Sequence, residues 1–339
     1  MASGDGQEIK QKIKHFAYSS GFSKIGFADC QPFCSESERI AKWFSEGRAG
    51  PLDYLSPEKM LDPQFVFPGG KSAIVVFLPY ARPDAVPGGA NGGMKLSRYL
   101  WGPDYHWVVK SRLQGLLEYI QDLAPGAKGR ACVDTAPLME RALAVRAGLG
   151  WQGKNTLLIA GKQGSWGFLG ALLLDIEIQP DEPFIGNRCG KCTNCIDACP
   201  TKALEPFRLD CRRCLTTWNI ESHAPPPTVV SKAISESGWV AGCDVCQEVC
   251  PWNRAPTWGD AALWGGPSTL HSKTAQELRL TPSQWKKRTA GTALSRVRHS
   301  HWTSILGMAG LSQNRANLGL QGTLAGQAVW GDSQERVTP

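Results

Sequence analysis

The chain has 339 residues with a formal net charge of +7, 42% hydrophobic and 20% charged residues, and twelve cysteines. This composition is typical of a globular protein with two or three domains. Residues 1–14 are polar and lack the apolar stretch or twin arginines of an export signal, and the longest apolar run, 169–174, is too short to cross a bilayer. We therefore expect a cytoplasmic protein without membrane contact, whose cysteines bind metal rather than form disulfides.

The N-terminal half, residues 1–180, has the pattern of a mixed α/β domain. Apolar residues at helical spacing predict helices, whereas unbroken apolar runs predict buried strands. Pro137 lies in the first turn of one such helix and Gly148 follows its end, as at many helix boundaries. The helices are expected over residues 9–17, 109–120 and 136–147, and the strands over 73–78, 157–160 and 169–178. A central sheet flanked by helices follows from this order.

The composition changes after Pro180. Residues 181–260 are rich in Cys, Pro and Arg and are expected to form a second domain. Residues 261–315 are expected to form a helical C-terminal segment, and residues 316–339 a disordered tail. The helices of the C-terminal segment are predicted over 275–278, 282–288 and 293–311.

Two related cysteine runs dominate the second domain. The first is Cys-x2-Cys-x2-Cys-x3-Cys-Pro, from Cys189 to Pro200, and the second is Cys-x2-Cys-x3-Cys-Pro, from Cys243 to Pro251. The first has the spacing of bacterial ferredoxins, in which three thiolates hold one cluster and the fourth reaches the other. Zinc sites use separated ligand pairs, so such a run serves zinc poorly. The sequence therefore predicts a bacterial-ferredoxin-like domain with two [4Fe–4S] clusters.

The cysteine count also predicts a ligand set. Two clusters need eight thiolates, and the two runs supply seven. We expect Cys214 to be the eighth ligand, with Cys211 as its competitor. By crossed ligation, the first set is Cys189, Cys192, Cys195 and Cys250, and the second set is Cys199, Cys214, Cys243 and Cys246. The remaining thiols, at Cys30, Cys34 and Cys132, are expected to bind no metal.

Several longer motifs reach across both domains. They are SRYxWGxDYH at 97–106, VDTAPLxER at 133–141, LGWxGKNT at 149–156, GSWxFLG at 164–170, CPTxAL at 199–204, RCLT at 213–216 and CDxCQxxCPWN at 243–253. Together they resemble the motifs of epoxyqueuosine reductases, cobalamin-dependent enzymes that complete queuosine synthesis on tRNA. The resemblance runs from about residue 10 to about residue 310. The cysteine runs alone fit many iron–sulfur proteins, whereas the CPWN and VDT motifs together are far more selective.

The resemblance implies a fold, two kinds of cofactor and a substrate. The fold class is an α/β (α+β) cobalamin-binding N-terminal domain followed by a ferredoxin-like 2[4Fe–4S] domain and a short helical tail. A base-off cobalamin lies between the domains and receives electrons through the clusters from an external low-potential donor. The substrate is tRNA carrying epoxyqueuosine at the wobble position, and the enzyme is expected to be a monomer. The cobalamin contacts implied are Ser97, Arg98, Tyr105, His106, Asp134, Asn155, Leu158, Ser165, Leu169 and Thr216.

Asp134 is the candidate catalytic residue. Opening an epoxide leaves an alkoxide, which a carboxyl group with a raised pKa can protonate in a closed pocket. In the family, the aspartate of the matching VDT motif donates this proton, so the resemblance implies the same role for Asp134. Position alone favours another role, in which Asp134 caps the helix that follows. One departure from the family is Met60, which stands where an arginine is usual.

A tRNA substrate also needs cations for its phosphates and a pocket for a splayed-out base. Clusters of Lys and Arg can also be an ordinary solvent-exposed helix face, which is the alternative explanation for the candidate cations of this chain. The candidate cations are Arg208, Arg212, Arg213, Lys286, Lys287, Arg288, Arg296 and Arg298, with Trp285 and Trp302 as nearby aromatic residues.

Two other functions are compatible with the cysteine framework. One is the reductive dehalogenation of small organohalides by a corrinoid enzyme. Reductive dehalogenases of this kind usually carry a twin-arginine signal. The other is an iron–sulfur electron-transfer module, for which the roughly 180 residues before the clusters are surplus. Of the three functions, we expect the chain to have that of an epoxyqueuosine reductase.

Overall fold

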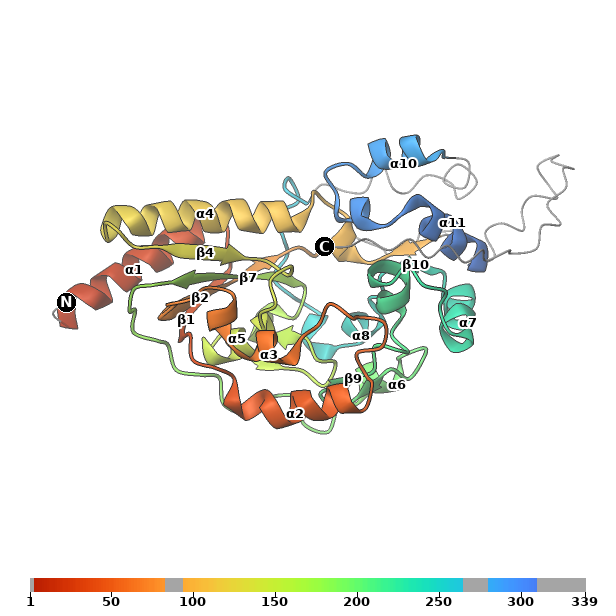
Figure 1. Ribbon diagram of the computed structural model, residues 1–339, viewed down its shortest axis with the longest axis horizontal. Helices are drawn as coiled ribbons and strands as arrows, with labels where there is room; N and C mark the ends of the chain where they lie inside the picture. The colour runs from red at the N-terminus through yellow and green to blue at the C-terminus, as the bar shows by residue number, and fades with distance from the viewer. Residues whose placement is uncertain (1–2, 83–93, 265–279, 310–339) are drawn as a thin grey trace, which may run out of the picture.

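The computed structural model describes residues 3–82, 94–264 and 280–309 (Figure 1). At its centre is a four-stranded sheet in the order β1-β2-β7-β4, in which every neighbouring pair is antiparallel. The strands are β1 (Lys24–Asp29), β2 (Ser72–Pro79), β7 (Gly167–Leu174) and β4 (Gly129–Cys132). All eight residues of β2 are buried, because helices cover both faces of the sheet.

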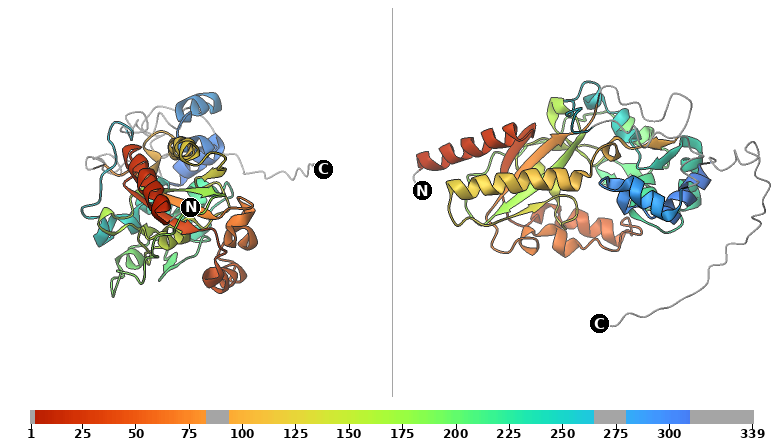
Figure 2. Two further views of the ribbon diagram at one scale, coloured as in Figure 1. Left: turned by 90° about the vertical axis from the view of Figure 1, so that its left-hand side faces the viewer. Right: turned by 90° about the horizontal axis from the view of Figure 1, so that it is seen from above.

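The alternation of side chains along β2 divides the N-terminal domain into two cores. Ile74 and Val76 pack on one face with α1 (Ser3–Ser19) and α4 (Tyr105–Leu123). Val75 and Phe77 pack on the other face with the short helix α5 (Glu140–Arg146). Figures 1 and 2 show α1 and α4 lying together across one face of the sheet.

The cysteine-rich region and the C-terminal segment form a second body, beyond one end of the sheet (Figure 1). A short parallel pairing joins β10 (Trp239–Ala241) to β3 (Lys95–Leu96), so a segment from the first half of the chain belongs to this body. Its core contains large side chains from both, including Leu100, Trp239 and Trp302. Its other elements are α6 (Asn194–Asp197), β8 (Leu204–Glu205), β9 (Arg208–Leu209), the π-helix η4 (Thr217–Glu221), α7 (Thr228–Ser237), α8 (Val245–Glu248), α10 (Pro282–Thr289), η6 (Ala293–Arg296) and α11 (His299–Met308).

Eight further elements complete the described part of the chain. They are α2 (Cys34–Ser45), α3 (Pro57–Leu61), η1 (Pro63–Phe65), η2 (Arg98–Leu100), the hairpin strands β5 (Trp151–Gln152) and β6 (Leu158–Ile159), η3 (Gly161–Gln163) and η5 (Pro251–Asn253). Within the described part of the chain, no helix is long and apolar enough to cross a membrane.

The structure confirms the helices predicted over 9–17, 109–120 and 282–288 and the strand predicted over 73–78, and it changes four other elements. The strand predicted over 169–178 ends at Leu174. The helix expected over 136–147 begins only at Glu140, because residues 134–139 form successive turns. The strand expected over 157–160 joins a small hairpin instead of the central sheet. The helix expected over 293–311 is interrupted at Val297, whose backbone is extended, and so becomes η6 and α11. The helix expected over 275–278 and the tail 316–339 lie outside the described residues.

Candidate active site

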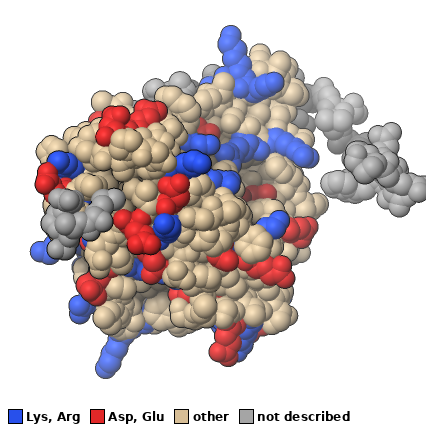
Figure 3. Space-filling model, turned by 60° about the vertical axis from the view of Figure 1, so that its left-hand side comes forward, with Lys and Arg blue, Asp and Glu red and all other residues tan. Residues whose placement is uncertain are grey.

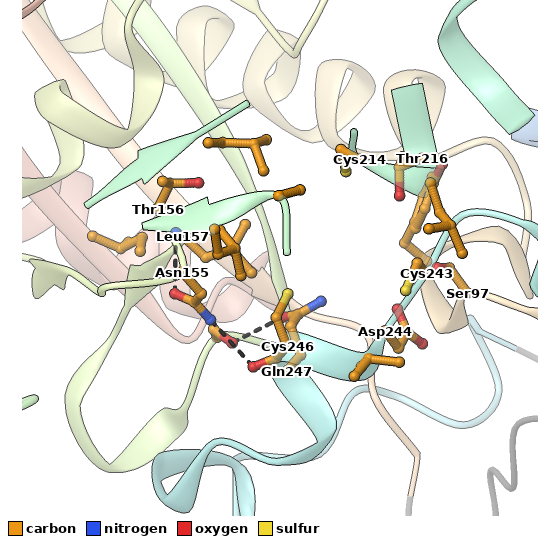
Figure 4. A pocket seen from close by; sticks show the side chains of 18 of the residues that line it. Ser97, Asn155, Thr156, Leu157, Cys214, Thr216, Cys243, Asp244, Cys246 and Gln247 are labelled. Atoms are coloured by element: carbon orange, nitrogen blue, oxygen red, sulfur yellow. Dashed lines mark hydrogen bonds between the residues drawn. The ribbon is translucent and has the colours of Figure 1, made fainter. Parts of the chain in front are cut away.

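A cavity of about 350 Å³ lies where the N-terminal domain meets the cysteine-rich region. Figure 4 shows Asn155 and Thr156 on one side of it and Ser97, Thr216 and Cys243 on the other. Eight of the ten residues expected at a cofactor line this cavity: Ser97, Tyr105, Asp134, Asn155, Leu158, Ser165, Leu169 and Thr216. Segments far apart in the sequence therefore meet at one site.

Arg98 and His106, the other two expected contacts, do not line this cavity. Arg98 instead ties the segment before α4 to the cysteine-rich region. Its backbone N–H and its Nη1 donate to Oδ2 of Asp244 at 2.8 and 3.2 Å, and Nη1 also donates to Glu248 at 2.8 Å. Asp244 is only 1% exposed, so this ion pair is a buried link between the segment before α4 and the cysteine-rich region.

Buried hydrogen bonds also hold the cavity walls together around Ser165. The Ser165 hydroxyl donates to Oε1 of Gln247 at 2.8 Å, and the Ser165 backbone N–H donates to Oδ1 of Asn253 at 2.7 Å. Gly164 has a φ of +75°, and a Cβ there would lie 2.3 Å from Oδ1 of Asn253. The GSW and CPWN motifs therefore contact each other directly, and Gly164 allows their close approach.

Asp134 lies in a turn at the cavity edge. Its Oδ2 accepts a hydrogen bond from the Tyr105 hydroxyl at 2.8 Å and lies 3.1 Å from Nε2 of His106. The other ring nitrogen of His106, Nδ1, lies 2.6 Å from Oδ1 of Asp104. Since α5 begins at Glu140 with Met139 as its N-cap, the expectation that Asp134 caps this helix is wrong.

The pKa of Asp134 is lowered, whereas the sequence led us to expect a raised pKa. Burial raises the pKa of its carboxyl, but hydrogen bonds from His106 and Tyr105 and the charges of His106 and Arg141 outweigh it, so the pKa is lowered. The side chain is 57% exposed, because it faces the open cavity. In this structure Asp134 is therefore a carboxylate near neutral pH.

The raised pKa belongs to a neighbouring carboxyl, Glu140, which the sequence reasoning did not single out. Burial, and then the negative charge of Asp134, raises the pKa of Glu140 to about 8. Its Oε1 accepts a hydrogen bond from the backbone N–H of Asp134 at 2.7 Å. Glu140 stands in the VDTAPLxER motif, but only the fold shows that it turns back onto Asp134.

Mutual charge effects connect the cysteines in two groups. Burial, and then the charges of Cys250, Cys189 and Cys192, raises the pKa of Cys195 to about 11. Burial likewise raises the pKa of Cys246, and Cys243, Cys214 and Cys199 add to the effect. Thiols so placed resist ionisation unless a cationic group compensates for the charge.

Cys214 and Cys211 have different surroundings. Cys214 lines the main cavity together with Cys199, Cys243 and Cys246. Cys211 is buried, its backbone N–H donates to the carbonyl of Arg48, and burial raises the pKa of its thiol to about 12. Its side chain does not line the cavity.

Other lining residues escaped the sequence reasoning because their role depends on the fold. Tyr80 ends up beside Gln247, whose Nε2 donates to the Tyr80 hydroxyl at 3.3 Å. Tyr99 and Glu221 also reach the cavity, the latter from the π-helix η4. Met60 does not line the cavity, so this departure from the family lies outside it.

The expected RNA-binding cations are distributed unevenly. Lys and Arg side chains gather toward the upper right of the face shown in Figure 3. Arg208 and Arg212, however, are neutralised by ion pairs to Glu205 and Asp210. Trp285 and Trp302, named as aromatic residues near these cations, are buried and stack on each other with ring centroids 4.8 Å apart.

Comparisons with known proteins agree with this arrangement. A family model described as "4Fe-4S double cluster binding domain" matches residues 188–253, and one described as "Epoxyqueuosine reductase QueG, DUF1730" matches residues 61–135. An epoxyqueuosine reductase of Gloeobacter violaceus is 38% identical over 327 residues, which cover 94% of this chain and 98% of that protein.

Solved structures match over a similar extent. The structure of epoxyqueuosine reductase from Streptococcus thermophilus has a TM-score of 0.81 and 28% identity, covering 91% of this chain and 83% of that one. A crystal structure of epoxyqueuosine reductase with an epoxyqueuosine-modified tRNA-Tyr stem loop has a TM-score of 0.81 and 27% identity, covering 90% of this chain and 81% of that one.

The double-cluster domain and the enzymes that match most of the chain define it as an iron–sulfur oxidoreductase. The coverage and the sequence identity of the match then show which family of oxidoreductases this is. The chain belongs to the epoxyqueuosine reductase family. This confirms the resemblance and the expected fold class, and it favours the reductase over the dehalogenase and the electron-transfer module.

Proposed function

We propose that the chain reduces epoxyqueuosine to queuosine at the wobble position of tRNA, with a base-off cobalamin in the main cavity and two [4Fe–4S] clusters beside it. Two electrons and two protons enter for each epoxide, and queuosine and water leave. An external low-potential donor supplies the electrons. Family membership and a relative solved with an epoxyqueuosine-modified stem loop support this substrate.

One observation carries the proposal. Asp134 and all four cysteines of the second set line the same cavity. A group bound there would touch the Asp134 carboxyl and would lie next to a set of thiols suited to an electron-carrying cluster. Reductive opening of an epoxide needs both electrons and protons at the same carbon–oxygen bond, and this cavity provides for both.

The cavity lining fits a cobalamin. Hydroxyl and amide side chains of Ser97, Asn155, Ser165 and Thr216 face the space and suit the amide-rich rim of a corrin. The apolar side chains of Leu158 and Leu169 can pack against its ring. When bound, cobalamin supplies low-potential two-electron chemistry at cobalt.

The thiol sets fit two cubane clusters. Iron–sulfur clusters are held by four thiolates each, and their cationic iron offsets the charge that otherwise keeps these thiols protonated. The proposed ligands are Cys189, Cys192, Cys195 and Cys250 for the first cluster and Cys199, Cys214, Cys243 and Cys246 for the second. Of the two candidates for the eighth ligand, Cys214 is supported because it faces the cavity with its three partners.

Asp134 is the proposed proton donor to the epoxide oxygen. In the open cavity, Tyr105 and His106 hold it as a carboxylate. Filling of the cavity would remove water from this half-exposed side chain, and this desolvation would favour the neutral acid. His106, hydrogen-bonded at the same oxygen, can pass a proton to it.

The decisive experiment uses the reduced, cobalamin-loaded and cluster-loaded protein with tRNA from cells that lack the final step of queuosine synthesis. Nucleosides from the digested tRNA are then analysed by mass spectrometry. Conversion to a product that has lost one oxygen atom supports the proposal. A holoenzyme that leaves the epoxide intact with a strong chemical reductant would refute it.

A further inference from the structure

A second cavity, of about 320 Å³, lies beside the turn that carries Asp134. Val133 and Thr135, the residues on either side of Asp134, line this second cavity, whereas Asp134 lines the main one. His106 also lines the second cavity, and its Nε2 is 3.1 Å from Oδ2 of Asp134. The His106–Asp134 pair therefore stands between the two cavities, so one extended ligand can occupy both.

The wall of the second cavity is positively charged. Lys110 from α4, Arg130 from β4 and Arg296 from η6 line it, and all three side chains are exposed. Within the described residues, neither Lys110 nor Arg296 forms an ion pair, and Arg130 donates to a backbone carbonyl, that of Val66, at 2.5 Å. These cations differ from Arg208 and Arg212, whose charges are neutralised by neighbouring carboxylates.

One acidic residue, Asp104, also stands in this wall, but its carboxylate is already engaged. Its Oδ1 accepts from the backbone N–H of His106 at 3.0 Å and lies 2.6 Å from Nδ1 of the same residue. The three cations therefore outweigh it, and the cavity favours an anionic ligand.

An exposed aromatic ring completes the second cavity. Trp107, in the first turn of α4, is 71% exposed. Trp258, the other described tryptophan with a large exposed surface, is 46% exposed. Aromatic side chains beside cations provide the stacking surface on which proteins hold unpaired bases. Trp285 and Trp302 cannot serve in this way, because both are buried.

We propose that the second cavity binds the RNA strand next to the reacting nucleotide, with Lys110, Arg130 and Arg296 on its phosphates and Trp107 stacked on an adjoining base. This inference rests on the proposed function, because it takes the main cavity as the place of the modified base. A wobble nucleotide can enter that cavity only if it leaves the stack of the anticodon loop. Its flanking phosphates and the base exposed beside it then need partners, and the second cavity adjoins the point of entry.

The test measures binding of a fluorescently labelled anticodon stem–loop RNA to the holoenzyme at several salt concentrations. Lys110→Ala with Arg296→Ala should weaken binding and reduce the slope of log Kd against log salt by about 1.4, or about 0.7 for each lost contact to single-stranded RNA. Trp107→Ala should weaken binding about tenfold, whereas Trp107→Phe should retain most of the affinity because it keeps a stacking ring.

Matched controls lie outside both cavities. Lys162→Ala removes an exposed cation and Trp258→Ala an exposed indole, and neither residue lines either cavity. Both controls should bind RNA like the wild-type protein. Unchanged affinity and salt slope in the Lys110/Arg296 and Trp107 variants, with unchanged iron content and melting temperature, would overturn the inference. Equal losses in the controls would do the same.

Activity on full-length tRNA separates this inference from the proposed function. If the wild-type protein binds the stem–loop with the salt slope described but never removes the epoxide oxygen, the proposed reaction fails and the RNA site stands. If the wild-type protein reduces the epoxide and the cavity variants do so with an unchanged KM, the RNA site fails and the reaction stands. A KM that rises more than kcat falls supports both.

Discussion

The backbone N–H of Asp134 donates a 2.7 Å hydrogen bond to Oε1 of Glu140, the first residue of α5. Asp134 has a φ of +57°, in the left-handed region that costs a residue with a Cβ roughly 1–2 kcal/mol. The bond to Glu140 stabilises this turn and so directs the Asp134 carboxylate toward Tyr105 and His106 at the cavity edge. A partly buried carboxyl with a raised pKa thus positions an exposed one with a lowered pKa.

The wild-type protein should become less stable as the pH rises through the range in which Glu140 titrates. Glu140→Gln should abolish this decrease. Because the pKa of Glu140 is raised from 4.5 to about 8, the folded protein keeps a proton that the unfolded chain releases. Wild-type stability therefore falls between about pH 4.5 and about pH 8. The variant lacks this proton exchange, so its stability relative to wild type should increase over that range by up to a few kcal/mol.

Melting temperatures measured at about pH 5 and about pH 8.5 test this expectation. The amide oxygen introduced by Glu140→Gln still accepts the Asp134 N–H, whereas Glu140→Ala removes the acceptor. Glu140→Ala should therefore lower activity even where Glu140→Gln retains it. A stability difference between wild type and Glu140→Gln that does not change with pH would contradict the raised pKa.

Asp134→Asn should abolish most turnover while leaving cofactor and RNA binding in place. The amide cannot deliver the proton that the epoxide oxygen needs, and loss of a general acid typically costs about 10²–10⁴ in rate. Single-turnover kinetics with the loaded enzyme measure the effect, and absorption spectra check that cobalamin and the clusters are bound. Wild-type turnover in this variant would eliminate the acid role.

Tyr105→Phe should shift the pH profile of the reaction. The Tyr105 hydroxyl donates to Asp134 at 2.8 Å and lowers the pKa of that carboxyl. Without this bond the pKa of Asp134 should rise, so the acid form persists to higher pH. If kcat depends on protonated Asp134, its alkaline limb should move upward in pH. A limb that stays in place would show that another group sets it.

The iron content of cysteine variants should separate Cys214 from Cys211. The wild-type chain should hold about eight irons after anaerobic reconstitution, four for each cluster. Cys214→Ala should lose the second cluster and fall to about four irons, whereas Cys211→Ala should keep about eight. The opposite result would assign the eighth ligand to Cys211.

Arg98→Ala should destabilise the contact between the segment before α4 and the cysteine-rich region. It leaves Asp244, 1% exposed, without its charge partner, and removing one member of a buried pair typically costs about 3–5 kcal/mol. Glu248→Ala is the matched control, because this partially exposed carboxylate also pairs with Arg98 but contributes about 1 kcal/mol or less. Denaturant unfolding of both variants measures the difference. Equal effects would show that Asp244 does not depend on Arg98.

Much of the molecule follows from local patterns in the sequence. The apolar run at 73–78 is the buried strand β2, and the apolar spacing at 109–120 is helix α4. The spacing of Cys189 to Cys199 predicts a ferredoxin-like domain, which the double-cluster family match confirms. These predictions succeed because strand burial, helical amphipathicity and cluster ligation are all set by residues close together in the chain.

The tertiary structure decided which distant residues meet. Asp104, His106, Asp134 and Glu140 occupy two separate motifs, and only the packing of α4 beside the end of β4 joins them into one hydrogen-bonded set. The pKa values of Asp134 and Glu140 then depend on burial and on neighbouring charges, which a linear sequence does not contain. The sequence by itself therefore determined many of the elements and the class of domain that the cysteine runs form. Folding alone decided the charge states at the cavity and the placement of Trp107 beside three cations.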